Sequence, residues 1–265
     1  MTVIEAQPKN RIERLFEAKS DGILSVFTTA GYPNLEDTIP VLEALQEAGV
    51  DMVELGMPFS DPLADGPVIQ NSSMQAIENG MRLQVLFEQL EGFRQKIHLP
   101  IVLMGYVNTV MQYGIEQFCE KCKALEIDGV ILPDLPHYEY ETIYKPYFER
   151  AGLPNVFLVS PSTTPERIRV LDQASKGFLY LVSSASTTGS DKAVTNTEAY
   201  LQRVKAMNLS SKTLVGFNIK DSESFQLACK YSNGAIIGSA FIKALGAHEG
   251  ALKEKVVNFV AGIKK

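Results

Sequence analysis

Eight short apolar runs recur along the 265-residue chain, and helical patterns separate them. The runs are mostly uninterrupted, as expected of parallel strands that are buried on both faces. Eight strands alternating with helices favour a closed (β/α)8 TIM barrel over an open doubly wound sheet, although an open sheet can also contain eight strands. The runs cover Ile23–Thr28, Met52–Leu55, Ile101–Met104, Gly129–Leu132, Val156–Val159, Phe178–Val182, Thr213–Gly216 and Ala235–Ile237.

Helices are predicted where apolar residues recur at helical spacing. An extra N-terminal helix over Arg11–Lys19 is expected before the first strand. Pro40 lies inside the helical pattern of Leu35–Glu47, so that helix either begins near Asp37, with Pro40 in its first turn, or is kinked. Between later strands the clearest helical segments are Leu83–Lys96, Glu116–Leu125, Pro165–Gln173, Glu198–Ala206 and Ser222–Tyr231.

Composition narrows the class of protein. The net charge of −6 disfavours a nucleic-acid or acidic-membrane surface, because neither would attract the chain electrostatically. No apolar run approaches the roughly 18–20 residues that span a bilayer, and no basic segment followed by an apolar one marks a secretory signal. The sequence has no flexible linker, low-complexity tract or strong internal repeat. We therefore expect one domain over residues 1–265 of a cytoplasmic enzyme.

Cys119 and Cys122 form a C-x-x-C pair, which is compatible with redox or metal chemistry. They also share one helical stripe with Phe118 and Leu125, and free cysteine commonly acts as a small buried apolar residue. The second interpretation is favoured, because no other cysteine or histidine pair lies nearby in sequence. The scattered histidines share no metal-ligand spacing either, and no metal site is predicted at His98, His137 or His248.

Acidic residues follow the second predicted strand, within the segment 53–70. Glu54 lies at the end of that strand among apolar neighbours, at the barrel end where catalytic groups usually gather. Burial there would raise the pKa of its carboxyl, which suits a group that gives and takes protons near neutral pH. Asp61 and Asp65 lie on the loop that follows, which contains prolines and Gly66. By themselves, these acidic residues are compatible with metal ligands or with solvated loop charges, and the lack of a histidine partner weakens the metal interpretation.

Gly238 and Ser239 follow the last predicted strand. Glycine lets the backbone approach a phosphate, and N–H groups and a serine hydroxyl can donate hydrogen bonds to it. The loops after the seventh and eighth strands are a recurrent phosphate site in barrels, although an isolated Gly-Ser pair is more often a simple turn.

The run from Glu54 to Gly66 closely resembles the signature of the tryptophan synthase α-subunit family. The resemblance extends along nearly the whole chain and implies a barrel lyase that splits indole-3-glycerol phosphate into indole and glyceraldehyde 3-phosphate. Further segments that resemble the family are Phe27–Pro33, Met104–Asn108, Pro133–Pro136, Tyr180–Ser183, Thr188–Gly189, Gly216–Phe217 and Gly238–Ser239.

Within the motif, Glu54 and Asp65 match the family's two catalytic carboxylates. The resemblance implies that Glu54 transfers protons and that Asp65 accepts the indole N–H. Tyr106 is expected to position the substrate or Glu54. The indole pocket is predicted around Phe27, Met104, Ile131, Tyr180 and Phe217, some of which are equally compatible with plain core positions. The phosphate is expected at Gly189, Phe217, Gly238 and Ser239.

Two segments depart from the family pattern. Ser186-Thr-Thr-Gly189 replaces a Gly-Val/Ile-Thr-Gly sequence, and Asn218 stands where a glycine is usual after Gly216 and Phe217. Asparagine tolerates left-handed backbone geometry but adds a side chain near the expected phosphate path. These changes predict altered loop closure, and lower activity until a partner closes the site.

The resemblance also implies a partner, the β subunit, which uses pyridoxal phosphate to make tryptophan from indole and serine. An α2β2 assembly is expected, with no cofactor in this subunit and with Asp61 at the interface, or else simply solvated. Two other functions compete with the lyase. One is a different phosphate-binding barrel enzyme, and the other is a weakly active subunit that mainly activates its partner.

Overall fold

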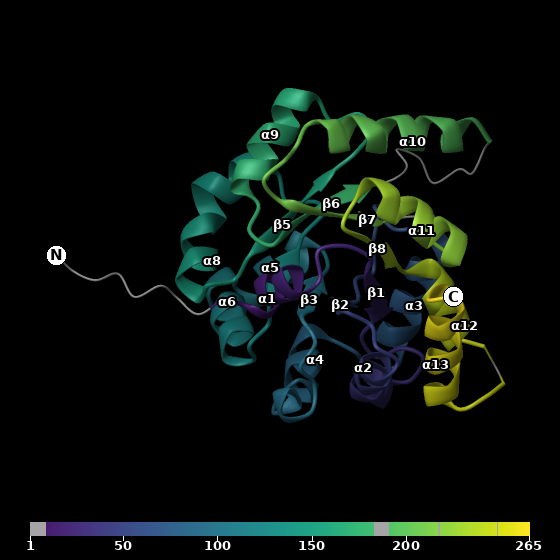
Figure 1. Ribbon diagram of the computed structural model, residues 1–265. Helices are drawn as coiled ribbons and strands as arrows, with labels where there is room; N and C mark the ends of the chain where they lie inside the picture. Colours follow the sequence, from purple (N-terminus) through teal and green to yellow (C-terminus); the bar gives the residue numbers. More distant parts are fainter. Residues whose placement is uncertain (1–8, 183–190, 217, 248) are drawn as a thin grey trace.

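The eight predicted strands form one closed parallel barrel in the computed structural model, which describes residues 9–182, 191–216, 218–247 and 249–265 (Figure 1). Each strand pairs with the next in sequence, and β8 pairs with β1 to close the ring. Every predicted strand agrees with the observed one to within a residue at each end. The strands are β1 (Ile23–Thr29), β2 (Met52–Gly56), β3 (Ile101–Met104), β4 (Gly129–Ile131), β5 (Asn155–Val159), β6 (Phe178–Val182), β7 (Lys212–Gly216) and β8 (Gly234–Ile237).

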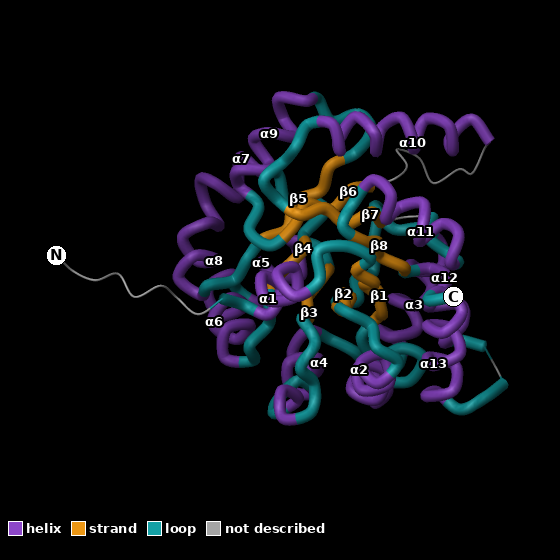
Figure 2. Tube along the Cα trace, in the orientation of Figure 1, coloured by secondary structure: helices purple, strands orange, loops and turns teal. Residues whose placement is uncertain are grey.

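Helices surround the ring of strands, as Figure 2 shows. The expected N-terminal helix is α1 (Arg11–Ala18), and the crossover from β1 to β2 contains η1 (Leu35–Asp37) and α2 (Thr38–Glu47). The remaining helices are α3 (Pro67–Glu78), α4 (Leu83–Gln89), η2 (Phe93–Gln95), α5 (Val107–Tyr113), α6 (Ile115–Ala124), α7 (His137–Glu139), η3 (Tyr140–Tyr144), α8 (Lys145–Ala151), α9 (Pro165–Ala174), α10 (Asp191–Ala206), α11 (Ser222–Tyr231), α12 (Ser239–Leu245) and α13 (Leu252–Ile263).

Two helical predictions are decided by the backbone. The α-helix in the first crossover begins at Thr38, so Pro40 lies in its first turn and the kinked alternative is wrong. The single helix predicted over Leu83–Lys96 is also wrong, because α4 ends at Gln89. Gly92 then adopts a φ of 71°, a left-handed conformation that glycine allows, and the chain continues as a short 3-10 turn.

Side chains along each strand alternate between two cores, because successive residues of a strand point to opposite faces. One apolar cluster lies between the barrel and its helices, and a smaller one fills the barrel. Glu54 pairs in register with Phe27 on β1 and with Val102 on β3, both members of the inner cluster. The register therefore directs the Glu54 side chain into the barrel.

Helix α1 covers the amino-terminal end of the barrel. Ile12 and Phe16 belong to the inner cluster, and the Phe16 ring lies 6.3 Å from the Phe178 ring at the start of β6. Arg11 holds this helix in place through Asp128, whose side chain is almost completely buried and also accepts a 2.6 Å hydrogen bond from Arg94. The backbone N–H of Ile101 donates to the same carboxylate.

Replacing Asp128 with alanine is expected to destabilise the fold by about 3 kcal/mol, because the largely buried Arg94 loses its charge partner. Glu126→Gln is the matched control: Glu126 is mostly exposed and pairs with Arg11, so its loss should cost roughly 1 kcal/mol or less. Urea unfolding of the three proteins measures both effects. Equal losses of unfolding free energy in the two variants would show that the buried charge network does not stabilise the amino-terminal end of the barrel.

The cysteine pair has the structural role that was favoured from the sequence. Cys119 and Cys122 are both buried on α6, and burial raises the pKa of the Cys119 thiol to about 12. Thiols that stay protonated are poor nucleophiles and metal ligands. Among the described residues, no group of three or more His, Cys, Asp or Glu side chains is arranged to hold a metal ion. None of the described helices combines the length and apolar character that a membrane span requires.

Candidate active site

Glu54 is a carboxylic acid enclosed in the barrel interior. Its side chain is fully buried, and burial raises its pKa to about 8. Within the described part of the chain, neither carboxyl oxygen has a hydrogen-bond partner. An unpaired buried carboxylate is costly, so near neutral pH the group holds its proton. Such a group can donate a proton to a bound molecule and later take one back.

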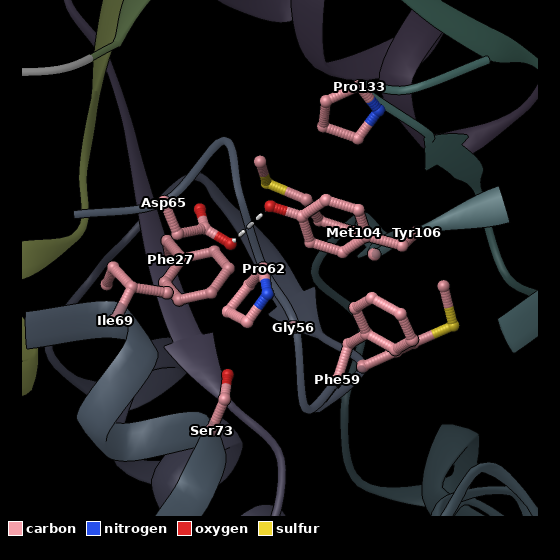
Figure 3. Close-up of a pocket in the computed structure, with 12 residues that line it drawn as sticks. Phe27, Gly56, Phe59, Pro62, Asp65, Ile69, Ser73, Met104, Tyr106 and Pro133 are labelled. Atoms are coloured by element: carbon pink, nitrogen blue, oxygen red, sulfur yellow. Dashed lines mark hydrogen bonds between the residues drawn. The ribbon is translucent and has the colours of Figure 1, made fainter. Parts of the chain in front are cut away.

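Asp65 is held by a tyrosine from the neighbouring strand-to-helix connection. The Tyr106 hydroxyl donates a 3.0 Å hydrogen bond to Asp65 Oδ2 (Figure 3). It also accepts a 2.9 Å hydrogen bond from the backbone N–H of Ala64. The Tyr106 ring stacks on Phe59, with 5.1 Å between centroids. Burial raises the pKa of the Asp65 carboxyl, and the bond from Tyr106 partly offsets this. The structure thus joins Tyr106 to Asp65, and the role of Tyr106 in positioning the substrate or Glu54 stays a prediction.

A cavity lies at the carboxyl ends of β1, β2 and β3 (Figure 3). Phe27, Met104 and Tyr106 line it, and Asp65 supplies its carboxylate. Glu54 is not among the lining residues, but its register partner Phe27 is, so Glu54 lies just inside the barrel from the cavity. The cavity thus combines the Asp65 carboxylate with apolar side chains, and the Glu54 carboxyl is buried deeper in the barrel. The full lining is Phe27, Gly56, Met57, Phe59, Pro62, Asp65, Ile69, Ser73, Met104, Gly105, Tyr106 and Pro133.

Sequence reasoning missed two lining residues on α3. Ile69 and Ser73 are four residues apart, so they share the face of α3 that meets the cavity (Figure 3). Their helical spacing, directly after the Glu54–Gly66 motif, was the signal that could have identified them. Phe59 was also missed, although it lies inside the motif.

Two glycines make room for aromatic rings inside the barrel. A Cβ on Gly56 would lie 2.6 Å from the Phe27 ring, and one on Gly216 would lie 2.0 Å from the Tyr180 hydroxyl. Tyr180 is almost fully buried in the inner cluster and does not line the cavity. Its hydroxyl pKa is raised, first by burial and then by the charges of Glu54 and Asp65. Tyr180 thus lies close enough to both carboxyl groups for their charges to raise the pKa of its hydroxyl.

The predicted phosphate residues are only partly described. Gly238 precedes the first residue of α12, the exposed Ser239, and a Cβ on Gly238 would lie 3.5 Å from Phe27. Gly238 thus lies beside the cavity wall formed by Phe27, and neither Gly238 nor Ser239 lines the cavity. Asn218 has a φ of 60°, the left-handed geometry expected where a glycine is replaced. Gly189, Phe217 and the altered Ser186–Gly189 segment lie outside the described residues.

Ile131 and Asp61 fall outside the cavity for different reasons. Ile131 is completely buried in the inner cluster, which agrees with its alternative interpretation as a core residue. Asp61 is exposed on the loop that carries Asp65, close in sequence to Leu63, which is 93% exposed. The loop therefore turns one acidic and one large apolar side chain toward solvent.

Known proteins resemble this chain over nearly its full length. The family profile described as tryptophan synthase alpha chain matches residues 14–264. The tryptophan synthase alpha chain of Flavobacterium psychrophilum is 53% identical over 89% of this chain and 93% of its own, and that of Flavobacterium johnsoniae is 50% identical over 96% and 100%.

Solved structures agree with the sequence relatives. Tryptophan synthase subunit alpha from Legionella pneumophila is 30% identical, covers 97% of this chain and 98% of its own, and has a TM-score of 0.87. A mutant tryptophan synthase alpha-subunit from Pyrococcus furiosus is 34% identical over 92% and 98%, with a TM-score of 0.83. Because the profile covers most of the chain and relatives share half or more of its residues, this chain belongs to the tryptophan synthase alpha chain family.

Proposed function

We propose that Glu54 and Asp65 are the two carboxyl groups with which this lyase splits indole-3-glycerol phosphate into indole and glyceraldehyde 3-phosphate. The reaction is that of the family to which the chain belongs. The roles of the two residues rest on one observation above all. A fully buried, proton-holding carboxyl lies inside the barrel beside a cavity that presents a second carboxyl.

The reaction is a retro-aldol cleavage with balanced proton transfers. Protonated Glu54 donates its proton to indole C3, which makes that carbon tetrahedral and places positive charge on the ring nitrogen. Asp65 accepts the N–H hydrogen bond and stabilises this charge. Glu54, now a carboxylate, removes the proton of the hydroxyl on the side-chain carbon next to the ring. That carbon becomes the aldehyde, the carbon–carbon bond breaks, and its electrons restore the indole ring.

The surrounding residues supply binding. Phe27 and Tyr106 flank the indole, with Tyr180 behind them, and the phosphate binds around Gly189, Phe217, Gly238 and Ser239. Because the two carboxyls handle both charge changes, neither step calls for a metal or an organic cofactor in this subunit. The support comes from the position of Phe27, which contacts the cavity and lies beside both Glu54 and Gly238.

The alpha chain pairs with a β chain, and the proposal gives Asp61 a place in that interface. The support is its exposure on the catalytic loop, near the exposed Leu63. Contact between the β chain and Asp61 would act on Asp65 directly, because both residues lie on the same loop. We expect an α2β2 complex, with pyridoxal phosphate bound by the β chain. We also propose a cytoplasmic location. The chain is proposed to form a single domain, because α13 near the end of the chain packs against α2 near its beginning.

The proposal is tested by incubating the purified chain with indole-3-glycerol phosphate and measuring indole, with and without a matched β subunit. Indole release by the chain is expected, with a faster rate in the complex because the partner closes the site. An absence of indole under both conditions would refute the proposal. Release that depends completely on the β subunit would favour the weakly active, partner-activating alternative, to which the replacement at Asn218 gives some support.

The activity is expected to fall as the pH rises through about 8. Burial raises the Glu54 pKa to about 8, and the first step uses the protonated form. The fraction of enzyme able to start the reaction is therefore full below that pKa and is lost above it. A pH profile of kcat/KM for indole formation measures this, since that ratio reports the free enzyme. A fall centred near the ordinary glutamate pKa of about 4 would contradict the role.

Tyr106→Phe is expected to lower kcat by roughly tenfold, corresponding to the loss of one hydrogen bond to a charged group. The variant keeps the ring that stacks on Phe59 but removes the hydroxyl that joins Asp65 to Ala64. Asp65 then loses its orientation while its charge remains. The control is Tyr138→Phe, because Tyr138 is 74% exposed on α7. Equal rates in the two variants would mean that Tyr106 does not position Asp65.

A further inference from the structure

A second cavity opens beside β4 and β5, and Pro133 lines both this cavity and the candidate active site. It lies between the connection that follows β4 and the first turns of α9. Its volume is about 200 Å³, which is below the roughly 300–1,000 Å³ of sites for drug-sized ligands and limits the occupant to a small molecule. Phe157, Leu135 and Leu171 are among its apolar walls, and its polar side chains are His137, Thr163 and Arg167.

The Arg167 guanidinium lies beside an imidazole. Arg167 Nη1 is 3.5 Å from His137 Nδ1, and the His137 ring packs on the Phe157 ring with 5.4 Å between centroids. Because arginine stays protonated, Nδ1 must be the accepting nitrogen, and the imidazole proton lies on Nε2. Nε2 faces Glu141 at 3.8 Å, and Glu141 is in turn paired with Lys145. An imidazole that accepts this bond at Nδ1 is neutral.

The charges around this pair leave a place for an anion. In the part of the chain that the structure describes, the Arg167 guanidinium has no ion-pair partner, and its only hydrogen bond is to His137. Burial and the charge of Arg167 both lower the His137 pKa. An anion in the cavity would reverse the second effect. It would attract the Arg167 hydrogen bond to itself, free Nδ1, and stabilise a proton there as a second donor.

We propose that this cavity binds a small aromatic carboxylate, with Arg167 and protonated His137 donating to the carboxylate and Phe157 and Leu171 contacting the ring. Two converging donors match the two oxygens of a carboxylate, and the apolar walls match a ring. Binding takes up one proton from solvent, onto His137 Nδ1. The site does not depend on the proposed lyase roles, because neither Arg167 nor His137 lines the other cavity.

The test is an NMR titration of the full chain with benzoate. The sequence contains only three histidines and no tryptophan, so the His137 ring signal is assigned by comparison with His137→Gln. Benzoate should move the titration midpoint of His137 to higher pH, and should bind several-fold more tightly at about pH 6 than at about pH 8. The benzoate charge itself stays constant in this range, because the carboxylic acid titrates near pH 4.

Matched variants separate this site from general anion binding. Arg167→Gln should weaken benzoate binding at least about tenfold, as loss of a charge-assisted contact predicts. Arg169→Gln, on the same helix but outside the cavity, should bind like the parent. His137→Gln should bind more weakly and lose the pH dependence. Neutral benzamide should leave the His137 midpoint in place. Benzoate binding that is equal in Arg167→Gln and Arg169→Gln, or an unmoved His137 midpoint, would overturn the proposal.

Discussion

Indole formation is expected to fall by at least about a thousandfold when Glu54 is replaced by glutamine, a loss of roughly 4 kcal/mol in transition-state stabilisation. Glutamine keeps the shape of the side chain but can neither give the proton to indole C3 nor take one from the hydroxyl. Both halves of the reaction lose their proton carrier together. Steady-state assays of indole release measure the loss, and Glu120→Gln, an exposed carboxyl on α6, is the control.

Stability distinguishes this catalytic loss from misfolding. The Glu54 pKa is higher in the folded chain than its ordinary value, so the folded state binds more protons, and its stability is full at low pH and declines as the pH rises through about 8. Glutamine stays neutral and removes that decline. Glu54→Gln should therefore unfold at the same temperature as the parent, or a higher one, above neutral pH. An inactive variant that also unfolds earlier would leave the loss attributable to folding, whereas a stable variant with more than a tenth of the parent rate would rule out the role.

Glu54→Gln also separates the lyase reaction of the chain from its activation of the β subunit. If the chain is chiefly a binding partner, Glu54→Gln should activate the β reaction fully while its own lyase activity is lost in a background that was already weak. If it is an efficient lyase, the complex should make tryptophan from indole but no longer from indole-3-glycerol phosphate. The same variant thus reports on chemistry and on partnership separately.

The strands were predictable because each is buried on both faces. A short apolar run such as Phe178–Val182, bounded by polar residues, is typical of a buried parallel strand, so its position could be predicted directly from the sequence. The prediction of one helix over Leu83–Lys96 was wrong, because the apolar periodicity does not show where the helix ends. Apolar spacing continues to Phe93, which is buried, but Gly92 turns the backbone before it. Burial and helical continuity are separate properties, and periodicity measures only the first.

The site was predictable to the extent that it is local. The motif carries both Glu54 and Asp65, and burial of Glu54 followed from its place on a strand. The hydrogen bond between Tyr106 and Asp65 joins residues 41 positions apart. The close approach of Tyr180 to the backbone of Gly216 depends on the pairing of β6 and β7. Side-chain spacing within one element cannot supply such contacts, because they depend on how two crossovers are placed around the ring.

Asp65→Asn is expected to lower kcat by about a hundredfold to a thousandfold, in the range for removal of one preorganised electrostatic contact. The amide oxygen can still accept the hydrogen bond from Tyr106, so the loop should keep its position. What disappears is the negative charge that, in the proposed mechanism, stabilises the positive ring nitrogen after protonation at C3. Because that charge exists only beyond the ground state, kcat should fall much more than KM rises.

Comparison with Tyr106→Phe shows whether charge or position matters more at Asp65. Tyr106→Phe disturbs the position and keeps the charge, whereas Asp65→Asn does the reverse. If the tyrosine acts only through the carboxylate, adding Tyr106→Phe to Asp65→Asn should cost little more, so the two effects should not add. Glu78→Gln, an exposed carboxyl at the end of α3, gives the baseline for loss of a distant charge. Additive losses in the double variant would mean that Tyr106 contacts the substrate independently, and an Asp65→Asn rate equal to that of Glu78→Gln would remove Asp65 from the mechanism.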